Sequence, residues 1–186
     1  ALASGGATAR GRLRISAPTL FSQAAMGKLA GGFALAYPDV RLEVTAEDRA
    51  VDMVEEGYDL VIRVNPDPDE NLVGRIFLRD RLVIVAHPAL RAPTRGKTAP
   101  AVVYGAGADK AEWSIIKGAR TTTLTVEPVL RLTSLLMVRD AVRAGAGVAR
   151  LPISLVSHDV DRGRLALWGK VDEPEVALWA LYPSRR

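Results

Sequence analysis

The order of strand-like and helix-like segments in the first part of the chain is the feature that most restricts its fold. Alternating apolar residues predict strands, and apolar residues at helical spacing predict helices. The predicted elements of this part of the chain come in the order strand, helix, strand, helix, strand. This order indicates right-handed crossovers and an open α/β sheet. The predicted strands cover 12–16, 40–44 and 59–64, and the predicted helices cover 18–37 and 49–57, the second capped by Asp48.

The rest of the chain predicts further strands and two more helices. Two strand-like segments lie within 72–88, and a hairpin over 111–128 is expected to turn at Lys117 and Gly118. A helix over 134–144 is expected to begin at Ser134, a good N-cap residue. The remaining predicted elements are strands over 100–104, 129–133, 148–152, 164–169 and 175–183, and a short helix within 153–163.

The composition excludes several kinds of site. The 186 residues include no cysteine, which excludes disulfides, cysteine nucleophiles and thiolate metal sites, and favours a reducing compartment. The net charge of +4 comes from Lys and Arg residues spread along the chain, so it indicates an ordinary solvated surface. No apolar stretch approaches the ~20 residues that cross a bilayer. We therefore expect a cytoplasmic protein without membrane contacts.

The glycine pair Gly145 and Gly147, in "AVRAGAGVARLP", raises the question of phosphate binding. Phosphate-binding glycine motifs lead from a strand into a helix, and the P-loop adds a lysine and a hydroxyl residue. Here the glycines follow a helix and lead into a strand. We interpret Gly145 as the left-handed residue that ends the helix, and Gly147 as the residue that lets the next strand begin close to it.

The sequence shows no arrangement typical of catalysis. Its two histidines, His87 and His158, lie at a strand end and in a polar turn, outside any metal-ligand spacing. The GxSxG motif of serine hydrolases is also absent. We therefore expect no enzyme activity, no metal site and no cofactor.

Four segments resemble motifs of one family, the effector-binding domain of LysR-type transcriptional regulators. They are "GRLRISAPTLFSQ", "FALAYPDVRLEV", "EEGYDLVIRV" and "AVRAGAGVARLP", and they extend over most of 11–152. The "YP" at Tyr182 and Pro183 resembles the family's final strand. Each segment alone is a weak signal, but four in the family's order and spacing are a specific one.

This resemblance implies an α/β fold like that of type II periplasmic binding proteins, in which two lobes are joined by two crossing strands and bind a small molecule between them. We expect the crossings near 83–86 and 176–180. The implied division is a tail over 1–11, a first lobe over 12–85, a second lobe over 86–163, and a return to the first lobe over 164–186. The family's winged helix-turn-helix and its last first-lobe helix are expected to be missing from this chain.

The function implied by the resemblance is a regulatory domain that senses a small-molecule effector, with DNA bound only through the missing N-terminal domain. The family's packing implies a homodimer or larger assembly through 19–36 and 41–44. A solute-binding receptor of a transport system has the same fold and remains an alternative, distinguished by a secretion signal in place of the helix-turn-helix. An enzyme on this fold is a third.

We expect the ligand to be a small organic anion. Thr19 lies at a helix start, where free N–H groups suit a carboxylate, and Arg63 ends a strand at the sheet edge where ligands of open α/β folds bind. Ser134 is expected to approach Thr19 from the other lobe. Each of these residues also has a purely structural alternative. Thr19 and Ser134 could only cap their helices, and Arg63 could pair with an Asp or Glu across the lobes. Trp113 could either line the cleft or cover the core of the hairpin. The predicted ligand-binding residues are Thr19, Leu20, Phe21, Arg63, Asn65 and Ser134.

Overall fold

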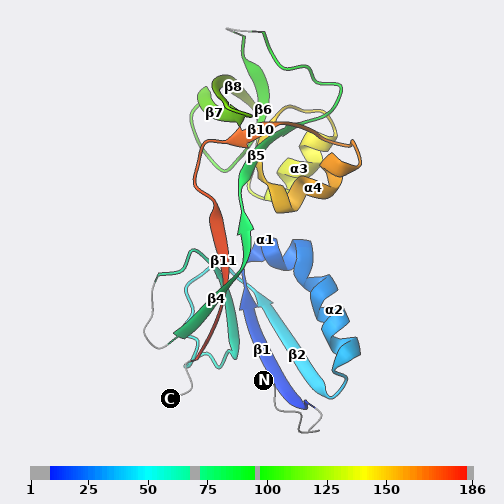
Figure 1. The fold of residues 1–186 in the computed structure, drawn as a ribbon, viewed down its shortest axis with the longest axis vertical. Coiled ribbons are helices and arrows are strands. Elements are labelled where there is room, and N and C mark those ends of the chain that lie inside the picture. Colours follow the sequence, from blue (N-terminus) through cyan, green and yellow to red (C-terminus); the bar gives the residue numbers. More distant parts are fainter. Residues whose placement is uncertain (1–8, 68–71, 95–96, 184–186) are drawn as a thin grey trace. The chain divides into compact units, whose positions relative to one another are not determined.

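The computed structural model of the chain describes residues 9–67, 72–94 and 97–183. The chain divides into two compact units. The first unit comprises Ala1–Arg79 and Ala177–Arg186, and the second comprises Asp80–Val176. The chain therefore passes between the units twice, as predicted for two lobes joined by two crossings (Figure 1). Most of the predicted tail over 1–11 lies outside the described residues, and the first strand already begins at Gly11.

A five-stranded sheet in the order β2-β1-β3-β11-β4 forms the first unit. Its strands are β1 (Gly11–Ala17), β2 (Val40–Ala46), β3 (Leu60–Val64), β4 (Leu72–Asp80) and β11 (Val176–Pro183). Strand β1 runs parallel to β2 and β3, as expected from the crossover connections. Strand β11 pairs antiparallel with β3, so both ends of the chain contribute to one sheet, which confirms the predicted return of the C-terminal segment.

The long helix predicted over 18–37 is confirmed as one continuous helical segment. It consists of α1 (Thr19–Phe21), the π-helical turn η1 (Ser22–Met26) and α2 (Gly27–Ala36). The helix and the sheet share a core of buried apolar residues: Ile15, Ala17, Met26, Ile62 and Leu178.

The predicted short helix over 49–57 is wrong, because the chain forms turns there. The carboxylate of Asp52 accepts hydrogen bonds from the backbone N–H groups of Val54 and Glu55, at 3.0 and 2.9 Å. Such side-chain bonds compete with helical bonding. Asp48 does not cap a helix at this place, since its side chain bonds to another part of the first unit. The turns still cover the sheet, with Met53 buried in a small apolar cluster.

A six-stranded sheet in the order β6-β8-β7-β10-β5-β9 forms the second unit. Its strands are β5 (Leu82–Ala86), β6 (Ala99–Tyr104), β7 (Ala111–Lys117), β8 (Arg120–Leu132), β9 (Ala149–Pro152) and β10 (Ala166–Val171). The hairpin of β7 and β8 turns after Lys117, which pairs with Arg120, as predicted. The separate strands predicted up to 128 and over 129–133 are one long strand, β8.

Two helices of the second unit match the predicted ones. They are α3 (Leu135–Arg143), which buries Val138 and Val142, and α4 (Ile153–Asp161), which buries Leu155 and Val156. Helix α4 follows Pro152, which has no hydrogen-bonding side chain. Asp80 takes the capping role, because its buried carboxylate accepts hydrogen bonds from the backbone N–H and the hydroxyl of Ser154.

The boundaries between the units differ from the predicted ones at residues 85 and 163. Strand β5 pairs with β9 and β10, so the first crossing comes before it, between Arg79 and Asp80. Strand β10 pairs with β5 and β7, so the chain returns to the first unit only after Val176. The order of the elements was predicted, but the assignment of a strand to a sheet depends on pairing partners far away in sequence.

The glycine pair turns the chain, as interpreted from the sequence. Gly145 has a φ of +89° directly after α3. Gly147 is buried, and its close neighbour is the backbone of β6 and not the helix end: an added Cβ would lie 2.5 Å from the carbonyl oxygen of Pro100. The same oxygen accepts a hydrogen bond from the backbone N–H of Val148, at 2.8 Å. Glycine is required at 147 because two backbones meet there.

We predict that Gly147→Ala lowers the free energy of unfolding by about 1–3 kcal/mol, because the added methyl group overlaps backbone that cannot move aside. Gly32→Ala is the matched control. An added Cβ at Gly32 meets nothing within 4 Å, and alanine in a helix is favoured over glycine by about 1 kcal/mol. Urea unfolding followed by circular dichroism gives both values. Equal stabilities of the two variants would contradict the assigned role of Gly147.

Candidate functional site

The carboxyl-end edge of the first sheet carries most of the predicted ligand-binding residues. Strand β1 ends at Ala17, and the helix begins two residues later at Thr19. The backbone N–H of Thr19 donates a hydrogen bond to Oδ1 of Asp48, at 2.9 Å. A carboxylate of the protein thus already occupies the position at which we expected the acid group of a ligand. Among the described residues, no partner is found for the next two amides, of Leu20 and Phe21.

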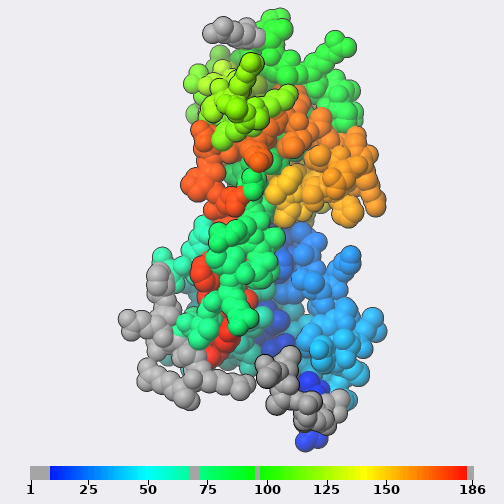
Figure 2. Space-filling model, in the orientation of Figure 1, coloured from blue at the N-terminus to red at the C-terminus, as the bar shows by residue number. Residues whose placement is uncertain are grey.

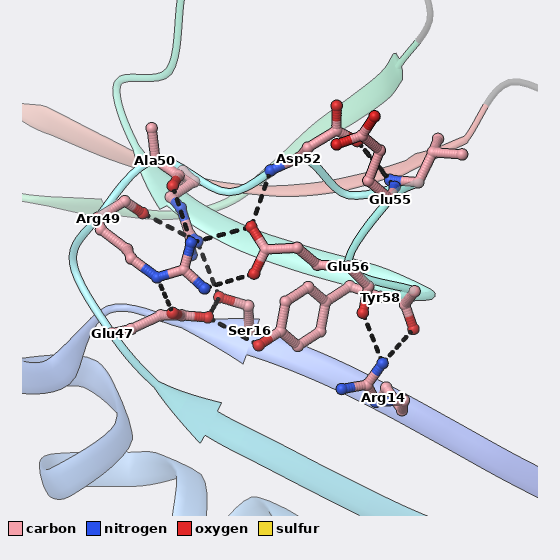
Figure 3. Close-up of polar contacts among 12 residues, drawn as sticks. Arg14, Ser16, Glu47, Arg49, Ala50, Asp52, Glu55, Glu56 and Tyr58 are labelled. Atoms are coloured by element: carbon pink, nitrogen blue, oxygen red, sulfur yellow. Dashed lines mark hydrogen bonds and ion pairs between the residues drawn. The ribbon is translucent and has the colours of Figure 1, made fainter.

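Glu47 is the centre of a polar network at the same edge (Figure 3). Its Oε1 accepts hydrogen bonds from the hydroxyls of Ser16 and Tyr58, at 2.8 and 2.9 Å, and its Oε2 lies 2.8 Å from Nε of Arg49. Burial alone would raise the pKa of Glu47, but these hydrogen bonds and the charge of Arg49 outweigh it and hold the pKa below its usual value. Glu47 is therefore an ionised carboxylate whose capacity to accept hydrogen bonds is largely taken up by Ser16, Tyr58 and Arg49.

Arg49 is also neutralised by a second carboxylate. Its guanidinium pairs with both oxygens of Glu56, and the contact to Oε1 measures 2.9 Å. The hydrogen bond from Arg49 lowers the pKa of Glu56. Figure 3 shows Arg49 held between Glu47 and Glu56. This arginine has little capacity left for an external anion.

Arg63 bonds to its own surroundings and not to a carboxylate. Its Nη2 donates to the hydroxyl of Ser16 at 2.8 Å, and its Nη1 donates to the carbonyl oxygen of Ile62 at 2.7 Å. Burial lowers its pKa. No ion pair to Arg63 is found within the described ranges. The predicted ion pair across the lobes and the predicted contact with an anion both stay predictions, and in this structure Arg63 orients Ser16.

Asn65 and Phe21 have structural partners. The side-chain oxygen of Asn65 accepts a hydrogen bond from the backbone N–H of Ala177 at 2.8 Å. The backbone N–H of Asn65 in turn donates to the carbonyl oxygen of Ala177 at 2.9 Å. These two bonds fasten the start of β11 to the end of β3. Phe21 packs edge-on against Phe77, with ring centroids 5.6 Å apart. Both residues hold together the edge where the ligand was predicted to bind.

The second unit contains a pocket of about 460 Å³. Strands β5, β6, β7, β8 and β9, the loop after β6 and the first residue of α3 contribute to its walls. Its volume falls in the range of small-molecule sites. Residues with large side chains in the lining are Tyr104, Trp113, Arg131, Leu135 and Arg150. No Asp or Glu is among the lining residues in the part of the chain that the structure describes.

Two guanidinium groups give this pocket its charge. Arg131 donates to the carbonyl oxygen of Ala108 at 2.7 Å, and its nearest carboxylate oxygen, on the fully exposed Asp109, is 3.4 Å away. Arg150 lies over the ring of Trp113, 5.9 Å from its centroid, and pairs with Glu173. Arg131 is therefore weakly neutralised, and Arg150 combines a cation with an aromatic wall.

The start of α3 adds to the positive character of the pocket. Leu135, the first residue of α3, is in the lining, so the positive end of the helix dipole lies at the pocket. Ser134 is the N-cap residue, as predicted, but its side chain makes no capping hydrogen bond among the described residues. Its hydroxyl is available for another partner. The predicted approach of Ser134 to Thr19 joins residues of different units and stays a prediction.

Comparison with known proteins decides the family. Residues 6–186 match the family model described as the LysR substrate binding domain. The chain belongs to this family. The resemblance found in four sequence segments is thereby confirmed.

Relatives of this LysR-family domain are transcriptional regulators. PtxR of Pseudomonas aeruginosa, described as an HTH-type transcriptional regulator, is 29% identical in an alignment of length 189 that covers 95% of this chain and 59% of that protein. LtrA of Klebsiella pneumoniae, described as a probable HTH-type transcriptional regulator, is 24% identical in an alignment of length 185 that covers 94% of this chain and 60% of that protein. The chain thus spans about three fifths of each relative. Neither supports the alternative of a transport receptor.

Solved structures confirm the two-lobed fold of the LysR-type domain. The regulatory domain of AphB from Vibrio vulnificus superposes with a TM-score of 0.76 at 22% identity, covering 97% of this chain and 92% of that one. The CrgA regulatory domain from Neisseria meningitidis gives a TM-score of 0.71 at 19% identity, covering 95% and 90%. Among the described helices, none is long and apolar enough to cross a membrane. Over the same part of the chain, no group of three His, Asp or Glu side chains could hold a metal ion.

Arg131, Arg150 and Tyr104 of this LysR-type domain line the pocket but were not among the ligand-binding residues predicted from the sequence. The rule that selected Arg63, a basic residue at the carboxyl end of a strand, applies equally to Arg131 at the end of β8. Arg150 gave no such signal, because it lies within a strand and reaches the pocket through the fold. Trp113 belongs to the core of the second unit, as one of its two alternatives states, and it also lines the pocket of that unit. Whether it lines a cleft between the lobes stays a prediction.

Proposed function

We propose that this domain senses a small organic anion, and that the pocket of the second unit binds the acid group of that ligand. The observation that carries the proposal is the composition of the pocket: Arg131 and Arg150 contribute two cations, while no acidic residue lines it in the described part of the chain. A carboxylate next to a guanidinium forms strong, charge-assisted hydrogen bonds. The aromatic rings of Tyr104 and Trp113 suit a flat apolar body, such as an aromatic carboxylate.

The proposed place of the acid group differs from the sequence-based prediction at Thr19. There the backbone amide is paired with Asp48, so an incoming anion has to displace a carboxylate that is part of the chain. Arg63 and Arg49, at the same edge, are also engaged. At Arg131 the competing carboxylate belongs to Asp109, which is fully exposed and 3.4 Å away. Ion pairs of this kind are weak. The ligand contacts predicted from the sequence at Thr19, Leu20, Phe21, Arg63, Asn65 and Ser134 stay predictions.

We infer that the whole protein is a LysR-type transcriptional regulator of the cytoplasm. Its DNA contacts then belong to a helix-turn-helix region outside this chain, as the descriptions of its relatives suggest. In this reading the domain is a sensor and not an enzyme. Binding of the anion changes the domain, and the change is passed to the DNA-binding region.

We also propose a homodimer or larger assembly formed through the helix of the first unit. Leu29 and Leu35 of α2 are 56% and 87% exposed, so this helix presents apolar side chains to solvent. Nothing lies within 4 Å of a Cβ added to Gly31, which leaves room for close approach of a partner. Figure 2 shows the blue atoms of α2 at the surface of the first unit.

The proposed ligand site can be tested with benzoate as the probe. Arg131→Gln removes a charge-assisted hydrogen bond worth roughly 1.5–3 kcal/mol, so benzoate affinity should fall about tenfold to a hundredfold in isothermal titration calorimetry. Arg120→Gln, at the exposed hairpin, changes the net charge equally and should bind like the parent. Thr19→Ala separates the two places for the acid group. A large loss in Thr19→Ala together with parent-like binding in Arg131→Gln would refute the proposed site.

The proposed assembly can be tested with a substitution in α2. Gly31→Arg places a long charged side chain on the exposed face of α2 and should shift the protein from dimer to monomer in sedimentation velocity, without lowering its melting temperature. Thr121→Arg, exposed on β8, adds the same charge and should leave the dimer intact. A parent protein that sediments as a monomer at high micromolar concentration would show that this surface does not associate.

A further inference from the structure

Arg150 stands between the pocket and a segment that leads out of the second unit. It lines the pocket and lies over Trp113, and its guanidinium also pairs with Glu173. Glu173 belongs to 172–175, here called the connecting segment, which joins the end of β10 to the start of β11. The chain passes back to the first unit directly after Val176. One side chain thus contacts both the proposed ligand site and the approach to a crossing.

The connecting segment is exposed and is held by a small number of contacts, all within the second unit. At its start, the backbone N–H of Asp172 donates to the carbonyl oxygen of Ser114 at 3.1 Å, and the hydroxyl of Ser114 donates to Oδ2 of Asp172 at 3.3 Å. In its middle, Glu173 pairs with Arg150, and at its end, Glu175 pairs with Arg81. Two hydrogen bonds to Ser114 hold the start of the segment, and two ion pairs hold its middle and its end. One of the two cations, Arg150, is a pocket residue.

We propose that an anion bound in the pocket competes with Glu173 for Arg150 and thereby releases the connecting segment. This inference rests on the proposed function, because it needs an anion at the pocket. Glu173 acts as an internal competitor: it neutralises Arg150 until a ligand carboxylate takes its place. Arg150 then has two roles. It contributes to the affinity for the ligand, and the loss of its pair with Glu173 on ligand binding frees the connecting segment.

The exposure of the ion pair makes this exchange feasible. The side chains of Arg150 and Glu173 are 30% and 45% exposed, and pairs so accessible to water hold together only weakly. A carboxylate inside the pocket meets Arg150 beside the ring of Trp113 and has Arg131 as a second cation. When Glu173 is released, its carboxylate is solvated by water, so no unpaired charge is left buried.

The pair of Arg81 and Glu175 limits how far the release extends. Arg81 is not among the residues that line the pocket, so an anion there does not compete for it. Its neighbour Asp80 is buried and caps α4. The expected movement is therefore confined to the part of the segment around Glu173, and the fold of the second unit is unchanged.

The test compares benzoate binding by the parent chain, Glu173→Gln and the matched control Glu175→Gln. Each substitution removes one exposed negative charge, and the two positions are two residues apart. Glu173→Gln frees Arg150, so benzoate affinity measured by calorimetry should rise about fivefold. Glu175→Gln should bind like the parent, because its partner lies outside the pocket. Melting temperatures of the three proteins serve as the check that all are folded.

Hydrogen exchange of the Asp172 amide provides a second readout, which is independent of the measured affinity. Benzoate should speed exchange of this amide in the parent, and Glu173→Gln should exchange it rapidly with or without benzoate. If benzoate binds the parent and Glu173→Gln equally well, or if Glu175→Gln binds it as tightly as Glu173→Gln, the competition is refuted and the proposed function stands. If benzoate binds none of the three at millimolar concentration, the proposed anion site itself is refuted, and the inference falls with it.

Discussion

Antiparallel pairing of β11 with β3 is the interaction on which the rest of the structure depends. Residues Val61 to Val64 pair with Leu178 to Leu181, and Asn65 adds two hydrogen bonds to Ala177. Strand β11 lies between β3 and β4, so β4 has a place in the sheet only when the C-terminal strand has entered it. The whole second unit is inserted between these partners. Contacts so distant in sequence form late and slowly in folding.

This arrangement explains how much of the fold could be predicted from the sequence. The alternation in 175–183 and the resemblance to LysR-type domains predicted a strand that returns to the first sheet, and the pairing confirms it. Gly145 was predicted from local chemistry, because a left-handed residue after a helix needs no distant partner. The unit boundaries were misplaced, since the sheets to which β5 and β10 belong are decided by partners far along the chain.

The candidate site shows the same division between local and distant causes. The helix start at Thr19 and the N-cap position of Ser134 follow from nearby residues, and both were predicted. The contact of Asp48 with Thr19 joins residues 29 positions apart and could not be predicted, because Asp48 had an equally good local role as the cap of a helix that does not form. Arg150 reaches the pocket only through the pairing of β9 with β5.

We propose that carboxylates of the chain itself determine where an external anion binds. At the edge of the first sheet, Asp48 occupies the backbone amide of Thr19, and Glu47 and Glu56 pair with Arg49. In the second unit, the carboxylate found near Arg131 is that of the fully exposed Asp109. A crystal structure of the domain with benzoate tests this account most directly. The account predicts a benzoate carboxylate oxygen at about 2.8 Å from the guanidinium of Arg131. A carboxylate bound instead at the start of α1, with Asp48 displaced from Thr19, would contradict it.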